Sequence, residues 1–136
     1  MNKKVLILGG SSDIGTELVK IFLENKYLNI SIHYHTNLKK IKVFKNKCKL
    51  IKAYLSHLNY KNILKKFDND YDIIVNLTGY ISGKSFQDYN LLSLEKTLRA
   101  NSHLPLLVFK KSLNKMIKKK WGRMVNTSSI GVKFGG

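Results

Sequence analysis

The sequence has one cysteine and one proline. The lone thiol of Cys48 excludes an intrachain disulfide, and no second thiol is present to share a metal ion, so we expect no metal site. We interpret Cys48 as an inert thiol near the start of a strand. Since proline is scarce and no serine- or glycine-rich spacer occurs, we expect residues 1–136 to form a single domain.

Long apolar runs are also missing. The segment MNKKVLILGG has four consecutive large apolar residues before its two glycines, which is too few for a membrane span or for the core of a signal peptide. We therefore expect a cytoplasmic protein with no membrane partner. A length of 136 residues and a hydrophobic content of 43% suit one domain with a core of ordinary size.

Arginine is scarce as well, although the formal net charge is +17. Only Arg99 and Arg123 among the 25 basic residues are arginine, whereas planar recognition of phosphates favours arginine. The lysines are scattered over nearly every expected helix and loop, so we interpret them as solvated faces and expect no nucleic-acid partner. A basic nucleic-acid-binding domain remains an alternative, which salt-dependent association with DNA or RNA would reveal.

Apolar segments alternate between the patterns of strands and of helices. Residues 5–8 form a continuous apolar run, which is typical of a strand buried on both faces of a parallel sheet. Further strands are expected within residues 27–35, 48–55, 71–77 and 122–128. This rhythm predicts the α/β class, a doubly wound parallel sheet whose ligand crevice lies at the carboxyl ends of its strands.

Helices are expected between these strands, within residues 58–70 and over residues 91–119. The first helix should begin near residue 13 and carry one apolar stripe that lies on the sheet. Its members recur at helical spacing and are Ile14, Leu18, Ile21 and Phe22.

A glycine-rich turn, LGGSSDIG, joins the first expected strand to this helix. Gly9 would allow the tight turn, and Gly15 would let helix and strand pack closely. Free backbone N–H groups and the positive end of the helix dipole would then face a pyrophosphate. The alternative is a helix cap with no ligand, since Ser11, Ser12 and Asp13 alone can cap a helix.

The segment GGSSDIG resembles the Gly-x-x-x-Gly-x-Gly turn of the short-chain dehydrogenases/reductases, with Leu8 where threonine is common and Asp13 where the middle glycine is usual. Asp13 would add a negative charge near the phosphates, but it can also cap the helix. The resemblance implies a Rossmann-like domain that normally has seven strands, of which this chain supplies the first five. It also implies pyrophosphate binding by Gly9, Ser11, Ser12, Asp13 and Ile14.

The segment VNLTG, residues 75–79, resembles the family's Asn-Asn-Ala-Gly motif, with Leu77 and Thr78 as departures. The resemblance implies that Asn76, Thr78 and Gly79 line the cofactor and that Asn76 also braces the sheet. A buried polar cap without a ligand is the alternative reading of Asn76.

The segment RANSHLPLLVF resembles the family helix that carries a catalytic asparagine, here Asn101. Independently, Pro105 has no N–H, so the carbonyl of Asn101 loses its intrahelical partner and the helix should kink. In the family this carbonyl is thought to hold a water of a proton relay. A proline kink without chemistry is the alternative.

The segment GRMVNTSSIG resembles the family's fifth strand, with Ser129 in the place of the serine that hydrogen-bonds the substrate carbonyl and Ser128 as the less favoured candidate. A hydroxyl can donate to a developing alkoxide. The family's acid is the tyrosine of a later Tyr-x-x-x-Lys helix, and no tyrosine follows Ser129. We therefore expect a C-terminally incomplete chain that is inactive alone, with an exposed edge and an uncovered apolar face beside its fifth strand.

The expected second strand ends in IHYHTN, without the acidic residue that hydrogen-bonds the ribose of NAD. Tyr34, His35 and Thr36 would meet the adenosine ribose, and the two lysines that follow favour NADP(H) over NAD(H). Strand-end histidines with no ligand role are the alternative. The segment AYLSHL resembles a stretch in which an aspartate contacts adenine. Tyr54 takes that place, and Leu55 would contribute through its backbone.

These features predict an oxidoreductase that transfers a hydride between NADP(H) and a small carbonyl or alcohol substrate, similar to a 3-oxoacyl-thioester reductase. The resemblance also implies that the full-length form is a homo-oligomer. A non-catalytic dinucleotide-binding or regulatory module is the alternative, which binding without turnover would support.

Overall fold

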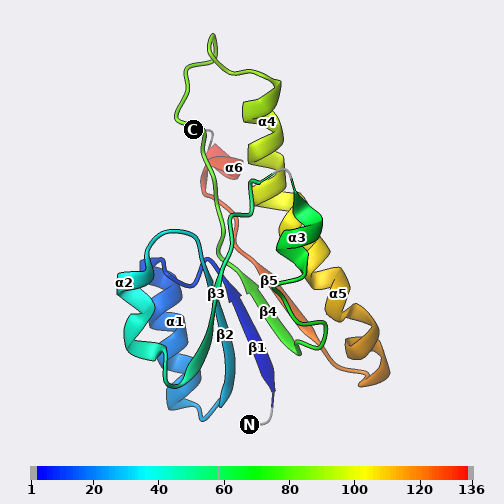
Figure 1. Ribbon diagram of the computed structural model, residues 1–136. Helices are drawn as coiled ribbons and strands as arrows, with labels where there is room; N and C mark the ends of the chain where they lie inside the picture. The colour runs from blue at the N-terminus through cyan, green and yellow to red at the C-terminus, as the bar shows by residue number, and fades with distance from the viewer. Residues whose placement is uncertain (1–2, 58, 135–136) are drawn as a thin grey trace.

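The computed structural model describes residues 3–57 and 59–134 and shows one sheet with helices on both faces (Figure 1). Its strands are β1 (Lys4–Leu8), β2 (Asn29–Tyr34), β3 (Cys48–Lys52), β4 (Ile73–Asn76) and β5 (Arg123–Asn126). All strand pairs are parallel, and the order is β3-β2-β1-β4-β5. Because the order reverses at β1, the sheet is doubly wound, which confirms the predicted fold class.

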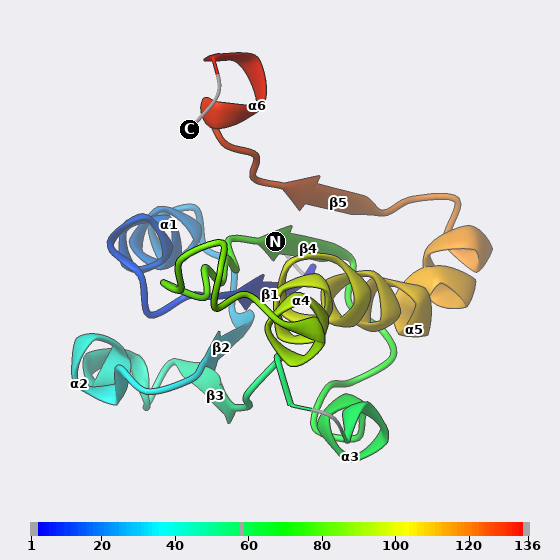
Figure 2. The same cartoon turned by 90° about the horizontal axis from the view of Figure 1, so that it is seen from above.

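The helices are α1 (Asp13–Glu24), α2 (Leu38–Ile41), α3 (Tyr60–Leu64), α4 (Leu91–Leu98), α5 (Leu104–Lys118) and α6 (Gly131–Phe134). Seen from above, α1 and α2 lie on one side of β1 and β2, whereas α3, α4 and α5 lie on the other (Figure 2). The short helix α2 was not predicted, because it buries only Ile41 and shows no apolar repeat.

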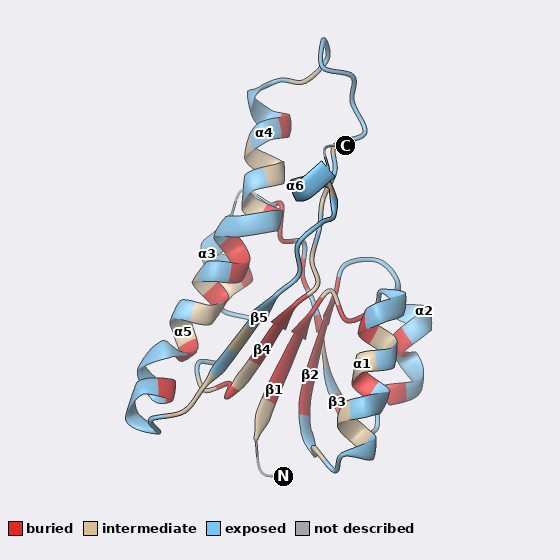
Figure 3. Ribbon diagram, turned by 180° about the vertical axis from the view of Figure 1, so that it is seen from behind, coloured by how far each residue is buried: buried red, intermediate tan, exposed pale blue. Residues whose placement is uncertain are grey.

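Side chains of the central strands alternate between two apolar clusters, one on each face of the sheet. Val5 and Ile7 pack with α1 and α2, whereas Leu6 and Leu8 pack with α3 and α5. These four side chains are 0% exposed, and the central strands are buried over most of their length (Figure 3). The continuous apolar run of β1 therefore reflects burial on both faces, as predicted.

The apolar face of α1 agrees only in part with the predicted stripe. Leu18 and Phe22 pack half-buried against the core as predicted. Ile14 and Ile21 are 70% and 52% exposed, whereas Val19 is fully buried and Gly15 is also buried. The helix meets the sheet through Gly15, because an added Cβ there would lie 2.6 Å from the Cα of Gly10. This close approach turns Val19 toward the sheet and leaves Ile14 and Ile21 on the outer side.

The long helical segment is interrupted where Pro105 predicted a disturbance. Residues Arg99–His103 form a π turn between α4 and α5, and the N–H of Leu104 donates to the carbonyl of Arg99. Pro105 lies in the first turn of α5, where its missing N–H is tolerated. The disturbance predicted at Pro105 is thus a π turn in the helical segment.

Strand β5 lies at one edge of the sheet and is the least covered strand. Val125 is 50% exposed, and Asn126 is also exposed. The described residues thus show the exposed edge that was predicted beside the fifth strand. At the far edge Cys48 is buried at the start of β3, and burial raises the pKa of its thiol to about 11, consistent with an inert thiol.

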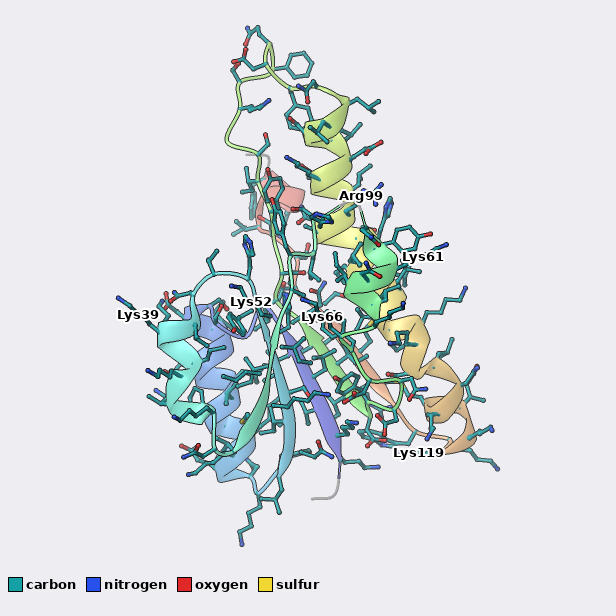
Figure 4. The ribbon with its side chains drawn as sticks, viewed as in Figure 1. Lys39, Lys52, Lys61, Lys66, Arg99 and Lys119 are labelled. Carbon is teal, nitrogen blue, oxygen red and sulfur yellow. The ribbon has the colours of Figure 1, made fainter. Side chains whose placement is uncertain are left out.

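Basic side chains lie on several separate elements of the structure. Figure 4 shows Lys39 on α2, Lys61 on α3 and Lys119 after α5 at separate corners of the molecule. Several lysines pair locally, as in the contact of 2.6 Å between Lys119 and Asp72. No helix within the described part of the chain is long and apolar enough to cross a membrane.

Candidate functional site

The glycine-rich turn between β1 and α1 is compact because Gly9 and Gly10 have no side chains. Gly9 has φ +74°, and a Cβ there would lie 3.0 Å from the carbonyl carbon and oxygen of Leu77. A Cβ on Gly10 would lie 2.6 Å from a methyl group of Ile32. The turn therefore brings the backbone after β1 against the end of β4, as a tight strand-to-helix connection requires.

The amino end of α1 opens directly from this turn. Ser12 caps the helix, since its Oγ accepts a hydrogen bond of 3.0 Å from the N–H of Gly15. The helix begins at Asp13, so the N–H groups of Asp13 and Ile14 have no carbonyl partner within the helix. Helix dipole and free donors together suit an anionic group at this end.

The carboxylate of Asp13 lies at the same helix end, where it would oppose an anion. It forms an ion pair with Lys40 of α2. Both side chains are largely exposed. The pair offsets the negative charge that the sequence places beside the turn.

His33 ties the turn to the neighbouring strands. Its Nδ1 accepts a hydrogen bond of 3.0 Å from the N–H of Gly9, and its Nε2 lies 3.1 Å from the carbonyl oxygen of Ala53. These partners require the neutral tautomer that carries its proton on Nε2. Burial lowers the pKa of His33 to about 4, which keeps the ring neutral at physiological pH. No pattern in the sequence distinguished His33 from the nearby exposed His35.

Asn76 braces the ends of β4 and β5. Its Nδ2 donates to Oδ1 of Asn126 over 3.2 Å, and its Oδ1 accepts from the N–H of Thr78 over 3.1 Å. Its backbone carbonyl also accepts from the N–H and the hydroxyl of Thr127. Because Asn76 is 4% exposed and both amide atoms are used, the geometry accounts for the bracing part of its predicted role.

Asn101 lies in the π turn and holds the loop that leaves β4. Its Oδ1 accepts from the N–H of Tyr80 over 2.7 Å, and its Nδ2 donates to the carbonyl of Tyr80 over 3.0 Å. The side chain thereby positions the backbone after Gly79. Asn101 itself is exposed.

A small pocket of about 100 Å³ opens where the chain leaves β2, β3 and β4. Four predicted cofactor residues, His35, Leu55, Thr78 and Gly79, line it together. Tyr54 also lines it and stacks on His35, with ring centroids 4.3 Å apart and 8° between the planes. The pocket therefore presents a planar aromatic surface at the carboxyl edge of the sheet.

Other predicted residues lie around this pocket rather than in it. The ring of Tyr34 packs in the core beneath α1 and α2, so only its backbone is available at the edge. Thr36 is exposed after β2, and Ser11 lies half-buried in the turn. Ser128 and Ser129 are exposed after β5, where Oγ of Ser129 accepts from the N–H of Gly131 over 3.2 Å.

Tyr80 and Lys84 have the Tyr-x-x-x-Lys spacing, which sequence reasoning overlooked at this place. They lie in the irregular loop between β4 and α4, and Gly83 between them has φ +65°. Four residues of irregular backbone do not place two side chains on one face as a helical turn does. The spacing alone therefore does not make a catalytic pair here.

Residues 3–136 match the family model described as short chain dehydrogenase. The chain is 40% identical over 79 residues, or 54% of its length, to a 3-oxoacyl-[acyl-carrier-protein] reductase of Aquifex aeolicus. A putative 3-oxoacyl-reductase from Bacillus thuringiensis superposes on 98% of the chain with a TM-score of 0.78 at 19% identity. A short-chain dehydrogenase from Sphingobium yanoikuyae, solved in complex with NADPH, superposes on 98% of it with a TM-score of 0.80 at 17% identity.

The chain is shorter than each of these proteins. It spans 32% of the Aquifex reductase, and its superpositions cover 60% and 57% of the two solved chains. At such low identity the solved structures establish the shared fold.

Proposed function

The chain belongs to the short chain dehydrogenase family, whose members are oxidoreductases that bind NAD(P), and from this premise we propose that its carboxyl edge holds NADP(H). The observation that carries the proposal is that His33, which lines the pocket with His35 and Leu55, also accepts from the N–H of Gly9 in the glycine-rich turn that opens α1. A side chain at Gly9 or Gly15 would fill space that the close approach of the backbone needs. The residues present thus fit an extended dinucleotide.

Each part of this edge has its own proposed task. The N–H groups of Ser11, Asp13 and Ile14 hold the pyrophosphate, with Gly9 and Ser12 shaping the turn, since the N–H of Ser12 already donates to the carbonyl of Gly9. Tyr34, through its backbone, and the side chains of His35 and Thr36 meet the adenosine ribose. Leu55, Asn76, Thr78 and Gly79 lie against the rest of the cofactor.

A preference for NADP(H) over NAD(H) is supported by the charges near β2. Thr36 and His35 follow this strand where an acidic residue would select an unphosphorylated ribose. Lys39 and Lys40 lie on α2, immediately beyond this segment. A neutral-to-basic setting favours a 2′-phosphate over a free hydroxyl.

The proposed reaction is transfer of a hydride between NADP(H) and a carbonyl or alcohol, with a 3-oxoacyl thioester as the favoured substrate class. The bound nicotinamide supplies or accepts the hydride. Ser129 donates a hydrogen bond to the substrate oxygen as negative charge develops there. The carbonyl of Asn101 accepts a hydrogen bond from a water that relays a proton. We propose that these residues alone bind the cofactor without completing turnover.

A homo-oligomer is proposed for the full-length form. Apolar side chains on one helix pair support it: Leu94, Leu98, Leu106, Leu113 and Ile117 are between 36% and 63% exposed. A surface with this many exposed leucines is typical of protein contacts. Size-exclusion chromatography with light scattering tests it, and a strictly monomeric full-length protein contradicts it.

Direct titration tests the proposed function. NADPH and NADH are added to the chain, and binding is followed by calorimetry, with NADPH expected to bind more tightly. Ser11→Glu places bulk and negative charge in the turn and should weaken NADPH binding at least about tenfold. The same change at Ser82, which is also half-buried but lies in the loop after β4, is the matched control. Binding of neither dinucleotide overturns the proposal, and oxidation of NADPH by this chain with an acetoacetyl thioester overturns its lack of turnover.

A further inference from the structure

The surface beside β3, at one edge of the sheet, is basic and has few acidic partners. Residues 25–67 contain eleven lysines and neither aspartate nor glutamate. The lysines of α2, of the turn after it and of β3 are all exposed, and Figure 4 shows Lys39 extending from α2 away from the sheet. Of these, only Lys40 and Lys49 form ion pairs within the described part of the chain. Most of the positive charge here is therefore not balanced locally.

An aliphatic side chain projects among these lysines. After α2 the chain makes a 3₁₀ turn, Lys42–Phe44, and the two inner side chains, Ile41 and Phe44, are buried in the core. Val43 points the other way and is 76% exposed. The exposed lysines of this segment that have no ion pair among the described residues define, with this valine, the α2 edge: Lys39, Lys42, Val43, Lys45 and Lys47.

The side chains of the α2 edge suit lipid better than nucleic acid. None is an arginine, whose planar fork recognises fixed phosphates, and none is an aromatic ring on which a base could stack. Lysine is a point charge that needs no fixed partner geometry, which suits mobile lipid headgroups. An aliphatic side chain such as Val43 is stabilised at the boundary between headgroups and acyl chains. Basic and aliphatic side chains on one outer surface are typical of a segment that lies on a membrane.

We propose that the α2 edge docks on the surface of an anionic phospholipid membrane, with its lysines at the headgroup phosphates and Val43 at the acyl boundary. The contact is peripheral, since no helix in the described ranges is long and apolar enough to span a bilayer. No membrane partner was expected from the sequence, because its apolar runs are short, but a surface contact needs no such run. The inference goes beyond the proposed function and does not depend on it.

Cosedimentation with lipid vesicles tests the proposal. Vesicles of phosphatidylcholine alone are compared with vesicles that also contain phosphatidylglycerol. Each lysine near an anionic surface contributes about fivefold to binding, so the four lysines predict a preference of at least about 100-fold for the anionic vesicles. Salt at about 1 M, where the Debye length falls to about 3 Å, should abolish this preference.

Two outcomes of this experiment contradict the proposal. Equal binding to both kinds of vesicle overturns it, because adhesion through exposed apolar surface elsewhere on the chain would give that result. Binding to polyuridylic acid without binding to anionic vesicles overturns the choice of lipid as the partner.

Paired lysine substitutions locate the contact. Lys42→Gln combined with Lys45→Gln removes two charges and should weaken binding to the anionic vesicles about 25-fold. Lys115→Gln combined with Lys118→Gln is the matched control, since both lysines are exposed on α5 at the same spacing. This control changes the net charge equally and should weaken binding less than about threefold. Equal losses overturn the location, because binding then follows net charge alone.

Substitution of the valine tests its insertion. Val43→Ser should weaken binding to the anionic vesicles about tenfold, because the apolar contact with the acyl boundary is lost. Ile81→Ser is the control, since Ile81 is 91% exposed in the loop after β4, and it should leave binding unchanged. Thermal melting verifies that each variant is folded. A folded Val43→Ser variant that binds like the parent chain overturns the insertion.

Discussion

The ring of His33 accepts a hydrogen bond from the backbone N–H of Gly9, with 3.0 Å between Nδ1 and N. The opposite ring nitrogen lies 3.1 Å from the carbonyl of Ala53, beyond the end of β3. One side chain on β2 therefore joins the turn after β1 to the segment that lines the aromatic pocket. The glycine-rich turn and the pocket segment of the candidate cofactor site are therefore held together by His33, a residue outside the turn.

Replacing His33 should cost stability. His33→Leu keeps a similar volume but leaves the N–H of Gly9 and the carbonyl of Ala53 without their partner. Each lost partner costs about 1 kcal/mol or more, so the free energy of unfolding should fall by about 2 kcal/mol. Urea denaturation measures it. His35→Leu, at an exposed neighbouring position, should change it by less than about 0.5 kcal/mol, and equal effects of the two changes contradict the role given to His33.

The same histidine predicts a dependence of stability on pH. Its pKa is about 4 in the folded protein, below the ordinary value of 6.5, because burial disfavours the charged ring. The unfolded chain therefore takes up a proton first as the pH falls. The stability that the neutral His33 ring contributes is therefore fully present above pH 6.5. It is lost between pH 6.5 and pH 4, on the order of 3 kcal/mol in all. Urea denaturation at pH 7, 6 and 5 measures the loss, and His33→Leu should flatten this profile; an unchanged profile contradicts the assignment.

Substitution by alanine should lower stability at one glycine near the site and leave it unchanged at another. A Cβ on Gly15 would lie 2.6 Å, 2.7 Å and 2.8 Å from backbone atoms of Gly10, which cannot move aside as a side chain can. Gly15→Ala should lower the free energy of unfolding by about 3 kcal/mol. Gly79→Ala meets nothing within 4 Å and should be neutral within about 0.5 kcal/mol. Thermal melting of the two variants checks this contrast, which fails if Gly15→Ala melts like the parent chain.

Replacing Asp72, which lies directly before β4 at the amino-terminal end of the strands, should lower stability. Its carboxylate accepts from Nζ of Lys119 over 2.6 Å and from the N–H of Lys4 over 2.9 Å. Burial alone would raise its pKa, but these hydrogen bonds outweigh burial and lower the pKa. Asp72→Asn places an amide NH₂ group, itself a donor, against one of these two donors. The free energy of unfolding should therefore fall by about 2 kcal/mol, which urea denaturation measures. Asp88→Asn, on an exposed loop, should cost almost nothing, and a similar cost at both positions argues against this account.

The ion pair between Asp13 and Lys40 should matter for ligand binding more than for folding. Lys40→Met leaves the charge of Asp13 unpaired at the amino end of α1 and should weaken NADPH binding about threefold. Adding Asp13→Asn should restore it, which a double-mutant cycle by calorimetry measures. If the double variant binds as weakly as Lys40→Met alone, the lysine acts on the phosphate directly rather than through Asp13.

The strands and the turn could be predicted because their signals are local. Val5 to Leu8 are apolar at every position, and the glycines after them fix the turn. The outer face of α1 could not be predicted in the same way. The spacing of Ile14 and Ile21 suits burial, but the contact of Gly15 with Gly10 decides which side of the helix faces the sheet.

The candidate site was predicted in part for the same reason. Motif residues such as Asn76 stand in a recognisable order along the chain. The contact of His33 with Gly9 joins residues 24 positions apart, and the stacking of His35 on Tyr54 depends on two strand ends meeting. Neither contact leaves a periodic trace in the sequence, because each is made by the packing of β2 beside its neighbours.

The position of β1 between β2 and β4 also has a consequence for synthesis. The chain leaves the ribosome from its amino end, so β1 and β2 can pair while β4, which begins at Ile73, has yet to be made. Until then one side of β1, which is apolar from Val5 to Leu8, has unpaired N–H and C=O groups. Such an open strand edge can pair with a second copy of the chain, so β4 protects β1 once it is made.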